Sequence, residues 1–152
     1  MNTIEVMTND IEPPSWMEKV TPMVECVLQY HNCSDVSCSV MFCNNEYMTQ
    51  LNETYRKQNV PTDVLSFCQQ EGELLPAEFD DAETQNLGDI VVSLEYVREN
   101  AQSFHVPEEQ EIRRVIIHGV LHLLGYDHET NDSDEKMLQL QEKLVKLGES
   151  LF

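Results

Sequence analysis

Segments with the period of a β-strand and segments with the period of an α-helix are interleaved along this chain. The two kinds of segment do not alternate strictly, and such an order favours an α+β fold with a mixed sheet over a doubly wound parallel sheet. Expected strands are residues 2–8, 36–42, 64–68 and 90–92, and expected helices start at or near Ser15, Asn44, Ser93, Pro107 and Asp132, with a kink or restart at Pro22.

Length and composition bound the class of protein. At 152 residues the chain fits one domain, residues 1–152, with a single hydrophobic core. Hydrophobic residues make up 41% and charged residues 24% of the chain, which excludes a disordered or fibrous protein. The first ten residues lack the basic and apolar regions of a signal peptide, and no run approaches the ~18 apolar residues of a membrane helix. We therefore expect a cytoplasmic protein with no membrane partner.

The chain is strongly acidic. Nine Lys and Arg residues against 28 Asp and Glu residues give a formal net charge of −19. This charge disfavours long-range attraction to a phosphate backbone, so no DNA partner is expected and any RNA contact has to be local. Six of the acids fall between residues 71 and 86, which we interpret as a solvated loop.

Five cysteines without a CxxC pair are a poor match to a disulfide framework or a zinc ribbon. We interpret them as reduced, mostly buried thiols. A second metal site built from Cys33, Cys38 and Cys43 remains an alternative, although the CxxxxC spacing is unusual for zinc.

The segment HGVLHLLGYDH, residues 118–128, holds three of the five histidines. His118 and His122 are four residues apart on an expected helix, so both imidazoles share one face and can reach one metal ion. Gly125 is expected to end this helix and turn the chain, which lets His128 return toward the same ion. Three imidazoles and a water make an open, catalytic type of site. The pattern therefore predicts a metal site, with zinc favoured and nickel, copper or iron also suitable.

The spacing HxxxHxxGxxH is also that of metzincin proteases, which carry a glutamate after the first histidine as general base. This chain has Gly119 at that position, so peptide hydrolysis by the metzincin route is disfavoured. The remaining histidines, His31 and His105, are expected to be structural and to lie outside the site.

Three blocks of sequence are similar to the YbeY family of bacterial rRNA-processing metallo-endoribonucleases. The blocks are NETYRKQNVPTDVLSF at residues 52–67, LGDIVVS at residues 87–93 and HGVLHLLGYDH at residues 118–128. The resemblance implies an α+β fold with a mixed sheet of about four strands flanked by about five helices. It also implies zinc-dependent cleavage of single-stranded RNA, maturation of the 3′ end of 16S rRNA in the small ribosomal subunit, and a part in ribosome quality control.

The resemblance also assigns residues. His118, His122 and His128 carry over as zinc ligands, and Arg56 carries over as the basic residue implicated in activity. The family usually has proline where this chain has Cys68, for which we expect a local change at the end of a strand.

Other residues of these blocks have two interpretations each. Asp63 and Asp89 are candidates to orient a zinc-bound histidine or to act as the general base, or they make turn and strand-end hydrogen bonds. Arg114, one turn before His118, is either a phosphate clamp beside the metal or the partner of Glu111 in a helix-stabilising ion pair.

Because the protein is acidic, we expect weak autonomous RNA binding through the metal, Arg56 and Lys57, with recruitment by a protein partner at the ribosome. Two other function classes stay open from the residues alone. One is a protease or other metal-dependent hydrolase of unknown substrate. The other is a non-catalytic ribosome-assembly factor whose structural zinc is closed by Asp127 or a cysteine.

Overall fold

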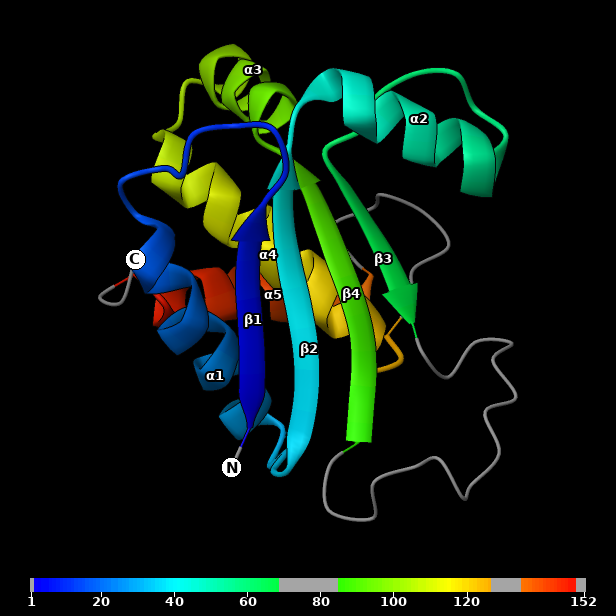
Figure 1. The fold of residues 1–152 in the computed structure, drawn as a ribbon. Helices are drawn as coiled ribbons and strands as arrows, with labels where there is room; N and C mark the ends of the chain where they lie inside the picture. The colour runs from blue at the N-terminus through cyan, green and yellow to red at the C-terminus, as the bar shows by residue number, and fades with distance from the viewer. Residues whose placement is uncertain (1, 69–84, 127–134, 150–152) are drawn as a thin grey trace, which may run out of the picture.

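The computed structural model describes residues 2–68, 85–126 and 135–149, and its centre is a four-stranded mixed sheet (Figure 1). The strand order is β1-β2-β4-β3, with β2 parallel to both β1 and β4, and β3 antiparallel to β4 at the edge. The strands are β1 (Thr3–Thr8), β2 (Val36–Cys43), β3 (Val64–Cys68) and β4 (Gln85–Ser93).

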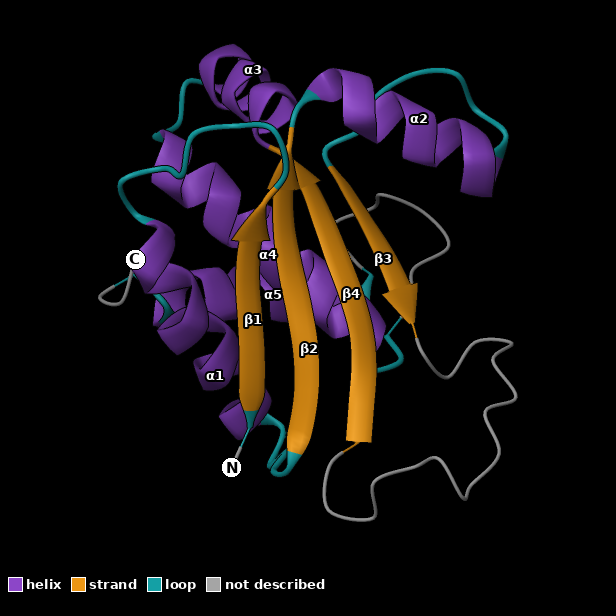
Figure 2. Ribbon diagram, in the orientation of Figure 1, coloured by secondary structure: helices purple, strands orange, loops and turns teal. Residues whose placement is uncertain are grey.

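Five α-helices accompany the sheet in the described part of the chain. α1, α4 and α5 lie on one face, and the described helices leave the opposite face uncovered except near α2 (Figure 2). This arrangement confirms the predicted α+β class with a mixed sheet of four strands. The helices are α1 (Val20–Tyr30), α2 (Asn45–Arg56), α3 (Leu94–Phe104), α4 (Glu108–Leu123) and α5 (Lys136–Leu147).

Two hydrophobic clusters hold the layers together. The larger cluster fills the space between the sheet and α1, α3, α4 and α5, with Val40, Ile90 and Ile116 fully buried. The smaller cluster joins Met48 of α2 to Leu65 on the other face of the sheet. Because side chains alternate between the two faces of a strand, consecutive residues of β3 pack on different helices.

Capping residues in the sequence correctly predicted the starts of two helices. The side chains of Asn44 and Ser93 cap α2 and α3 by accepting the backbone N–H of the residue three positions later, as predicted. The cap predicted at Ser15 is wrong, because the chain enters α1 through a short 3₁₀ helix, Met17–Lys19, that has no side-chain cap. Pro22 lies in the first turn of α1, where proline is tolerated.

Other boundaries differ from the predictions. Pro107 precedes α4 directly instead of occupying its first turn. β4 begins at Gln85 and not at residue 90, because its first half pairs with β2 across an irregularity between Ser37 and Cys38. The predicted start of the last helix at Asp132, and most of the predicted loop at residues 71–86, lie outside the described residues.

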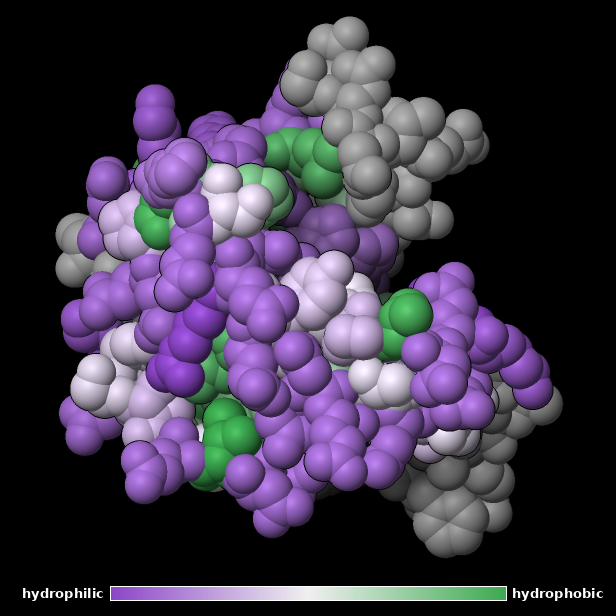
Figure 3. Space-filling model, turned by 90° about the horizontal axis from the view of Figure 1, so that it is seen from above, coloured by the Kyte–Doolittle hydropathy of each residue, from purple (hydrophilic) through white to green (hydrophobic). Residues whose placement is uncertain are grey.

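The surface seen from above is mostly hydrophilic, with hydrophobic residues confined to small separate patches (Figure 3). No helix among the described residues combines the length and the apolar character needed to cross a membrane.

Candidate metal centre

The histidine-bearing helix α4 packs unusually close to the sheet at Gly119. A Cβ atom at this position would lie 2.9 Å from Cγ2 of Ile90 on β4, which is nearer than real Cβ contacts allow. The glutamate that a metzincin carries after its first histidine therefore has no space here. Close packing of helix on sheet is a physical reason for the glycine and agrees with the argument against a protease of that type.

His118 and His122 stand side by side on α4, as their spacing predicted. Their Nε2 atoms are 3.0 Å apart, and both side chains are partly buried. Two nitrogens bound to one tetrahedral zinc at ~2.05 Å are separated by roughly 3.3 Å. The pair therefore fits a single metal ion with little movement.

α4 ends in a Schellman motif that turns the chain. Gly125 has φ +99°, and its N–H donates to the carbonyl of His122 at 3.0 Å while the N–H of Tyr126 donates to the carbonyl of Leu121 at 3.0 Å. The helix stop predicted at Gly125 is confirmed. His128, predicted as the third ligand, lies outside the described residues, as does Asp127.

A cleft of about 950 Å³ opens beside the two histidines. Arg56, the exposed last residue of α2, lines the same cleft although it is 62 positions before His118 in the sequence. β3 and the segment leading into it form the wall between them. The residues that the resemblance assigned, as far as the structure describes them, thus share one cavity.

The edge strand β3 fixes that wall to α4. The hydroxyl of Ser66 donates to the carbonyl of Gly119 at 3.5 Å, and the thiol of Cys68 donates to the carbonyl of His122 at 3.3 Å. Cys68 is the last residue of β3, so the departure from the family pattern falls at a strand end, as expected.

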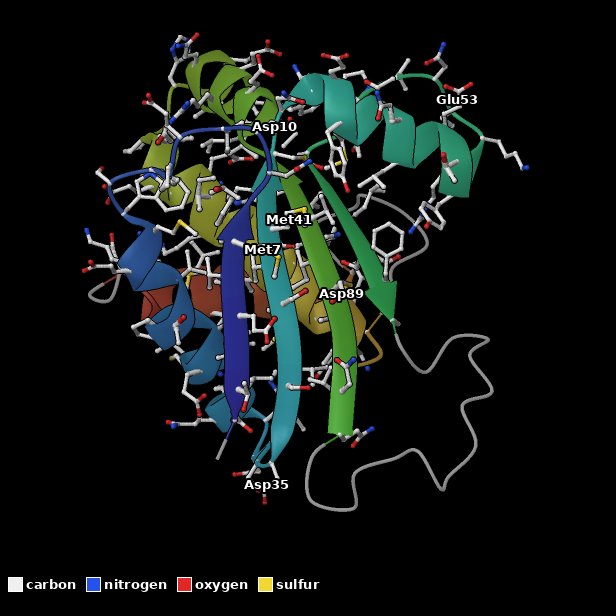
Figure 4. The ribbon with its side chains drawn as sticks, viewed as in Figure 1. Met7, Asp10, Asp35, Met41, Glu53 and Asp89 are labelled. Carbon is white, nitrogen blue, oxygen red and sulfur yellow. The ribbon has the colours of Figure 1, made fainter. Side chains whose placement is uncertain are left out.

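Of the two candidate aspartates, one lines the cleft and the other does not. Asp63 lines the cleft, where its Oδ1 accepts the N–H of Val64 at 2.8 Å. Asp89 points away from α4, on the face shared with Met7 and Met41, and accepts the hydroxyl of Ser39 at 2.5 Å (Figure 4). Asp89 therefore has a structural role, as a hydrogen-bond partner within the sheet. For Asp63 both interpretations stand, a turn hydrogen bond and a role in the site.

Arg114 is held by carboxylates on two helices. Its Nε and Nη2 donate to the two oxygens of Glu142 at 2.9 Å each, and its Nη1 donates to Glu111 at 2.8 Å. The predicted pair with Glu111 is confirmed, and Arg114 also lines the cleft. With its guanidinium engaged by two acids, Arg114 serves to join α4 to α5 and is a poor phosphate clamp.

In the part of the chain that the structure describes, Cys33, Cys38 and Cys43 do not form a second metal site. All five are free thiols, and among the described residues no three His, Cys, Asp or Glu side chains are grouped to hold a metal ion. Burial raises the pKa of Cys38 to about 11 and that of Cys43 to about 12, so these thiols stay protonated at neutral pH. The five cysteines are free thiols as predicted, but the expectation that most are buried is wrong, because only Cys38 and Cys43 are buried.

The two histidines outside the motif have structural positions. His105 is the exposed C-cap of α3 in a left-handed conformation, with φ +56°. His31 follows α1, accepts or donates a hydrogen bond with the hydroxyl of Tyr126 at 3.1 Å, and does not line the cleft. Through this hydrogen bond to Tyr126, His31 stabilises the turn after α4.

Sequence reasoning missed two polar residues of the site. Gln141 on α5 is 7% exposed and its Oε1 lies 2.6 Å from Nδ1 of His118. Asn52 on α2 is buried and donates to the carbonyl of Val60, which holds the segment beside Arg56. A signal existed for Gln141, because it falls between Met137 and Leu144 on the buried stripe of α5, where a polar side chain needs a partner.

Together these features define a class: α+β proteins in which a helix packed on a mixed sheet presents paired histidines to an open cleft. A model of the endoribonuclease YbeY family matches residues 3–148. The chain belongs to this family.

Known proteins are similar in sequence or structure to this chain over most of its length. The chain is 42% identical to the endoribonuclease YbeY of Treponema pallidum (strain Nichols) over 147 residues, which cover 95% of this chain and 89% of that protein. It is 44% identical to endoribonuclease YbeY of Borreliella burgdorferi (strain ZS7) over 131 residues, 85% of this chain and 84% of that one. The solution structure of TM1509 from Thermotoga maritima superposes with a TM-score of 0.66 at 31% identity and covers 97% of this chain and 89% of that one.

Proposed function

We propose that this protein is a zinc-dependent endoribonuclease that cleaves single-stranded RNA in the cleft between α4 and β3. The observation that carries the proposal is the pair of Nε2 atoms, 3.0 Å apart, in the same cleft as Arg56. The relatives named endoribonuclease, at 42% and 44% identity, supply the substrate class. His118, His122 and His128 are the proposed metal ligands.

The residues of the cleft have different roles in the proposed reaction. His118, His122 and His128 would hold a zinc ion, which would supply a Lewis acid for a phosphoryl oxygen. Arg56 donates hydrogen bonds to the phosphoryl oxygens and stabilises the charge that develops on them. Asp63 lines the cleft with a carboxylate that can accept a proton from the attacking hydroxyl, whether that hydroxyl belongs to water or to the ribose, whereas Glu111, which also lines the cleft, is paired with Arg114.

The cellular role in this proposal follows the family. The substrate is 16S rRNA, the reaction matures its 3′ end, and the protein works on the small ribosomal subunit in the cytoplasm as part of ribosome quality control. Because the net charge is −19, we propose that a protein partner at the ribosome brings the enzyme to its RNA.

The experiment compares RNA and protein substrates on the same preparations. Zinc-loaded protein is incubated with single-stranded RNA, double-stranded RNA and casein, with and without a chelator, and zinc content is measured by elemental analysis. The variants are His118→Ala and Arg56→Ala. Their matched controls are His105→Asn, an exposed histidine that tolerates asparagine in its left-handed conformation, and Arg98→Ala, an exposed arginine on α3.

We expect cleavage of single-stranded RNA that is lost with the chelator. His118→Ala should lose both zinc and activity, Arg56→Ala should keep zinc and lose activity by about 10²-fold or more, and both controls should behave like the wild type. Cleavage of casein in place of RNA would establish the alternative hydrolase. Retained zinc with no cleavage of either substrate would establish the non-catalytic assembly factor.

A further inference from the structure

The imidazole of His118 has different partners at its two nitrogens. Nε2 faces His122, while Nδ1 lies 2.6 Å from Oε1 of Gln141 on α5. Gln141 is 7% exposed, so its amide has few water molecules with which to satisfy its hydrogen bonds. The imidazole of His118 is therefore a main hydrogen-bond partner of the Gln141 amide.

Glu142 decides which way the Gln141 amide faces. Nε2 of Gln141 donates to Oε2 of Glu142 at 3.2 Å. An ionised carboxylate only accepts hydrogen bonds, so a rotated amide would place its carbonyl oxygen against the Glu142 oxygens and repel them. The carbonyl oxygen of Gln141 consequently faces His118.

Arg114 keeps Glu142 in place and ionised. The two-point contact from its Nε and Nη2 fixes both carboxylate oxygens at 2.9 Å. The same hydrogen bonds lower the pKa of the Glu142 carboxyl group, so it is an acceptor throughout the neutral range. A continuous chain of contacts thus runs from Arg114 through Glu142 and Gln141 to His118.

The end of this chain sets the tautomer of His118. A carbonyl oxygen 2.6 Å from Nδ1 requires a hydrogen on Nδ1. A neutral imidazole carries a single N–H, so the lone pair then resides on Nε2, the atom that faces His122. This is the protonation pattern that a metal ligand bound through Nε2 needs.

We propose that Gln141 is a positioning residue of the metal centre, whose side-chain carbonyl holds His118 as the Nδ1–H tautomer and directs the Nε2 lone pair toward the metal. The inference rests on the proposed metal centre and does not depend on RNA cleavage. Glu142 and Arg114 act through Gln141, so the salt bridge between α4 and α5 is part of the support of the site.

The test uses the full chain and two kinds of readout. Zinc affinity is measured at neutral pH by competition with a chromophoric chelator for the wild type, Gln141→Leu, Gln141→Met and Gln141→Glu. Gln139→Leu is the matched control, because Gln139 is exposed on the same helix. Long-range ¹H–¹⁵N spectra of metal-free protein with ¹⁵N-labelled histidine report the tautomer of His118, assigned with His118→Ala.

Leu and Met occupy about the volume of glutamine but lack its carbonyl, so we expect zinc affinity to fall about 10- to 100-fold in both and the tautomers of His118 to become mixed. Gln141→Glu keeps an acceptor for His118 but sets its second oxygen against Glu142, so its affinity should lie between those of Gln141→Leu and the wild type. Gln139→Leu should leave the affinity unchanged.

A wild-type His118 found as the Nε2–H tautomer would overturn the inference, whether or not the variants fold. Unchanged zinc affinity in folded Gln141→Leu or Gln141→Met would overturn it as well. Failure of the proposed function gives a different result: wild-type protein would bind zinc no better than His118→Ala, or would bind zinc and leave RNA intact.

Discussion

At the scale of single residues, Gly119 shows how packing and chemistry meet at one position. The metzincin spacing surrounds this glycine, but the nearest atoms to a side chain placed there are Cγ2, Cδ1 and Cγ1 of Ile90, at 2.9 to 3.2 Å. Ile90 is fully buried and β-branched, so it cannot swing aside. The glycine lets α4 approach β4, and this approach sets how far the histidines stand from the wall of the cleft.

The first prediction concerns Gly119→Ala. Alanine should gain up to about 1 kcal/mol in helix propensity, but overpacking against Ile90 should cost about 1–3 kcal/mol, for a net loss of about 1 kcal/mol. Urea unfolding of the single variant, of Ile90→Ala and of the double variant measures the coupling. In the Ile90→Ala background the alanine should cost less than in the wild type. An equal cost in both backgrounds would show that the contact with Ile90 is not the cause.

At the scale of elements, the contact between α4 and α5 joins two tasks. Met137 and Leu144 of α5 belong to the large hydrophobic cluster, while Gln141 and Glu142 reach the polar side of α4. The hydrophobic residues stabilise the docking of α5, and the polar residues decide its register against His118. A helix that is far from the histidine motif in sequence thereby becomes part of the site.

The second prediction is a pH dependence of the Arg114–Glu142 pair. Hydrogen bonding from Arg114 lowers the pKa of Glu142 below its ordinary value of 4.5, so the pair stabilises the fold above that pH and loses its contribution as the pH falls through the lowered pKa. Because the Glu142 side chain is 53% exposed, the contribution at pH 7 should be below about 1 kcal/mol.

Chemical unfolding of the wild type and Glu142→Gln, from pH 7 down into acid, measures this dependence. The difference in free energy of unfolding should be present at neutral pH and should disappear in acid. Glu99→Gln, an exposed acid on α3, is the control and should show no such trend. A difference that grows as the pH falls would contradict the assignment.

At the scale of the whole molecule, acidity is spread over the surface and basic groups are few. The acids labelled in Figure 4, Asp10, Asp35, Glu53 and Asp89, lie at both ends of the sheet, on α2 and on the open face. Arg56 and Lys57, by contrast, are neighbours at the end of α2, and Arg56 lines the cleft. Of the basic residues, Arg56 and Lys57 are therefore the ones that we expect to meet RNA bound in the cleft.

The third prediction is a weak, shallow salt dependence of RNA binding. If only Arg56 and Lys57 meet phosphates, metal-free protein should bind single-stranded RNA weakly, with a slope of log affinity against log salt near −1.4. Fluorescence anisotropy between 50 and 200 mM salt measures the slope. Arg56→Ala with Lys57→Ala should bring it close to zero, whereas Lys146→Ala on α5 should not change it. Tight binding by metal-free protein would refute the local-contact interpretation.

The sequence by itself determined most of the elements and the side-by-side placement of His118 and His122. Alternation and 3.6-residue periods place strands and helices because they depend on neighbours in the chain, and the spacing of His118 and His122 sets them on one helical face. Caps at Asn44 and Ser93 and the stop at Gly125 are likewise local, since their hydrogen bonds reach only a few residues.

Only the tertiary structure decided which distant residues share the cleft. Asp63 and Asp89 looked equivalent in sequence, but Asp63 directly precedes β3 and lines the cleft, whereas Asp89 lies within β4 and faces away from α4. Gln141 reaches His118 across 23 positions of chain, and Arg114 is committed to Glu142 across 28. Such contacts follow from how α4 and α5 pack, which no short-range pattern encodes, so the supporting residues of the site became visible only in the folded chain.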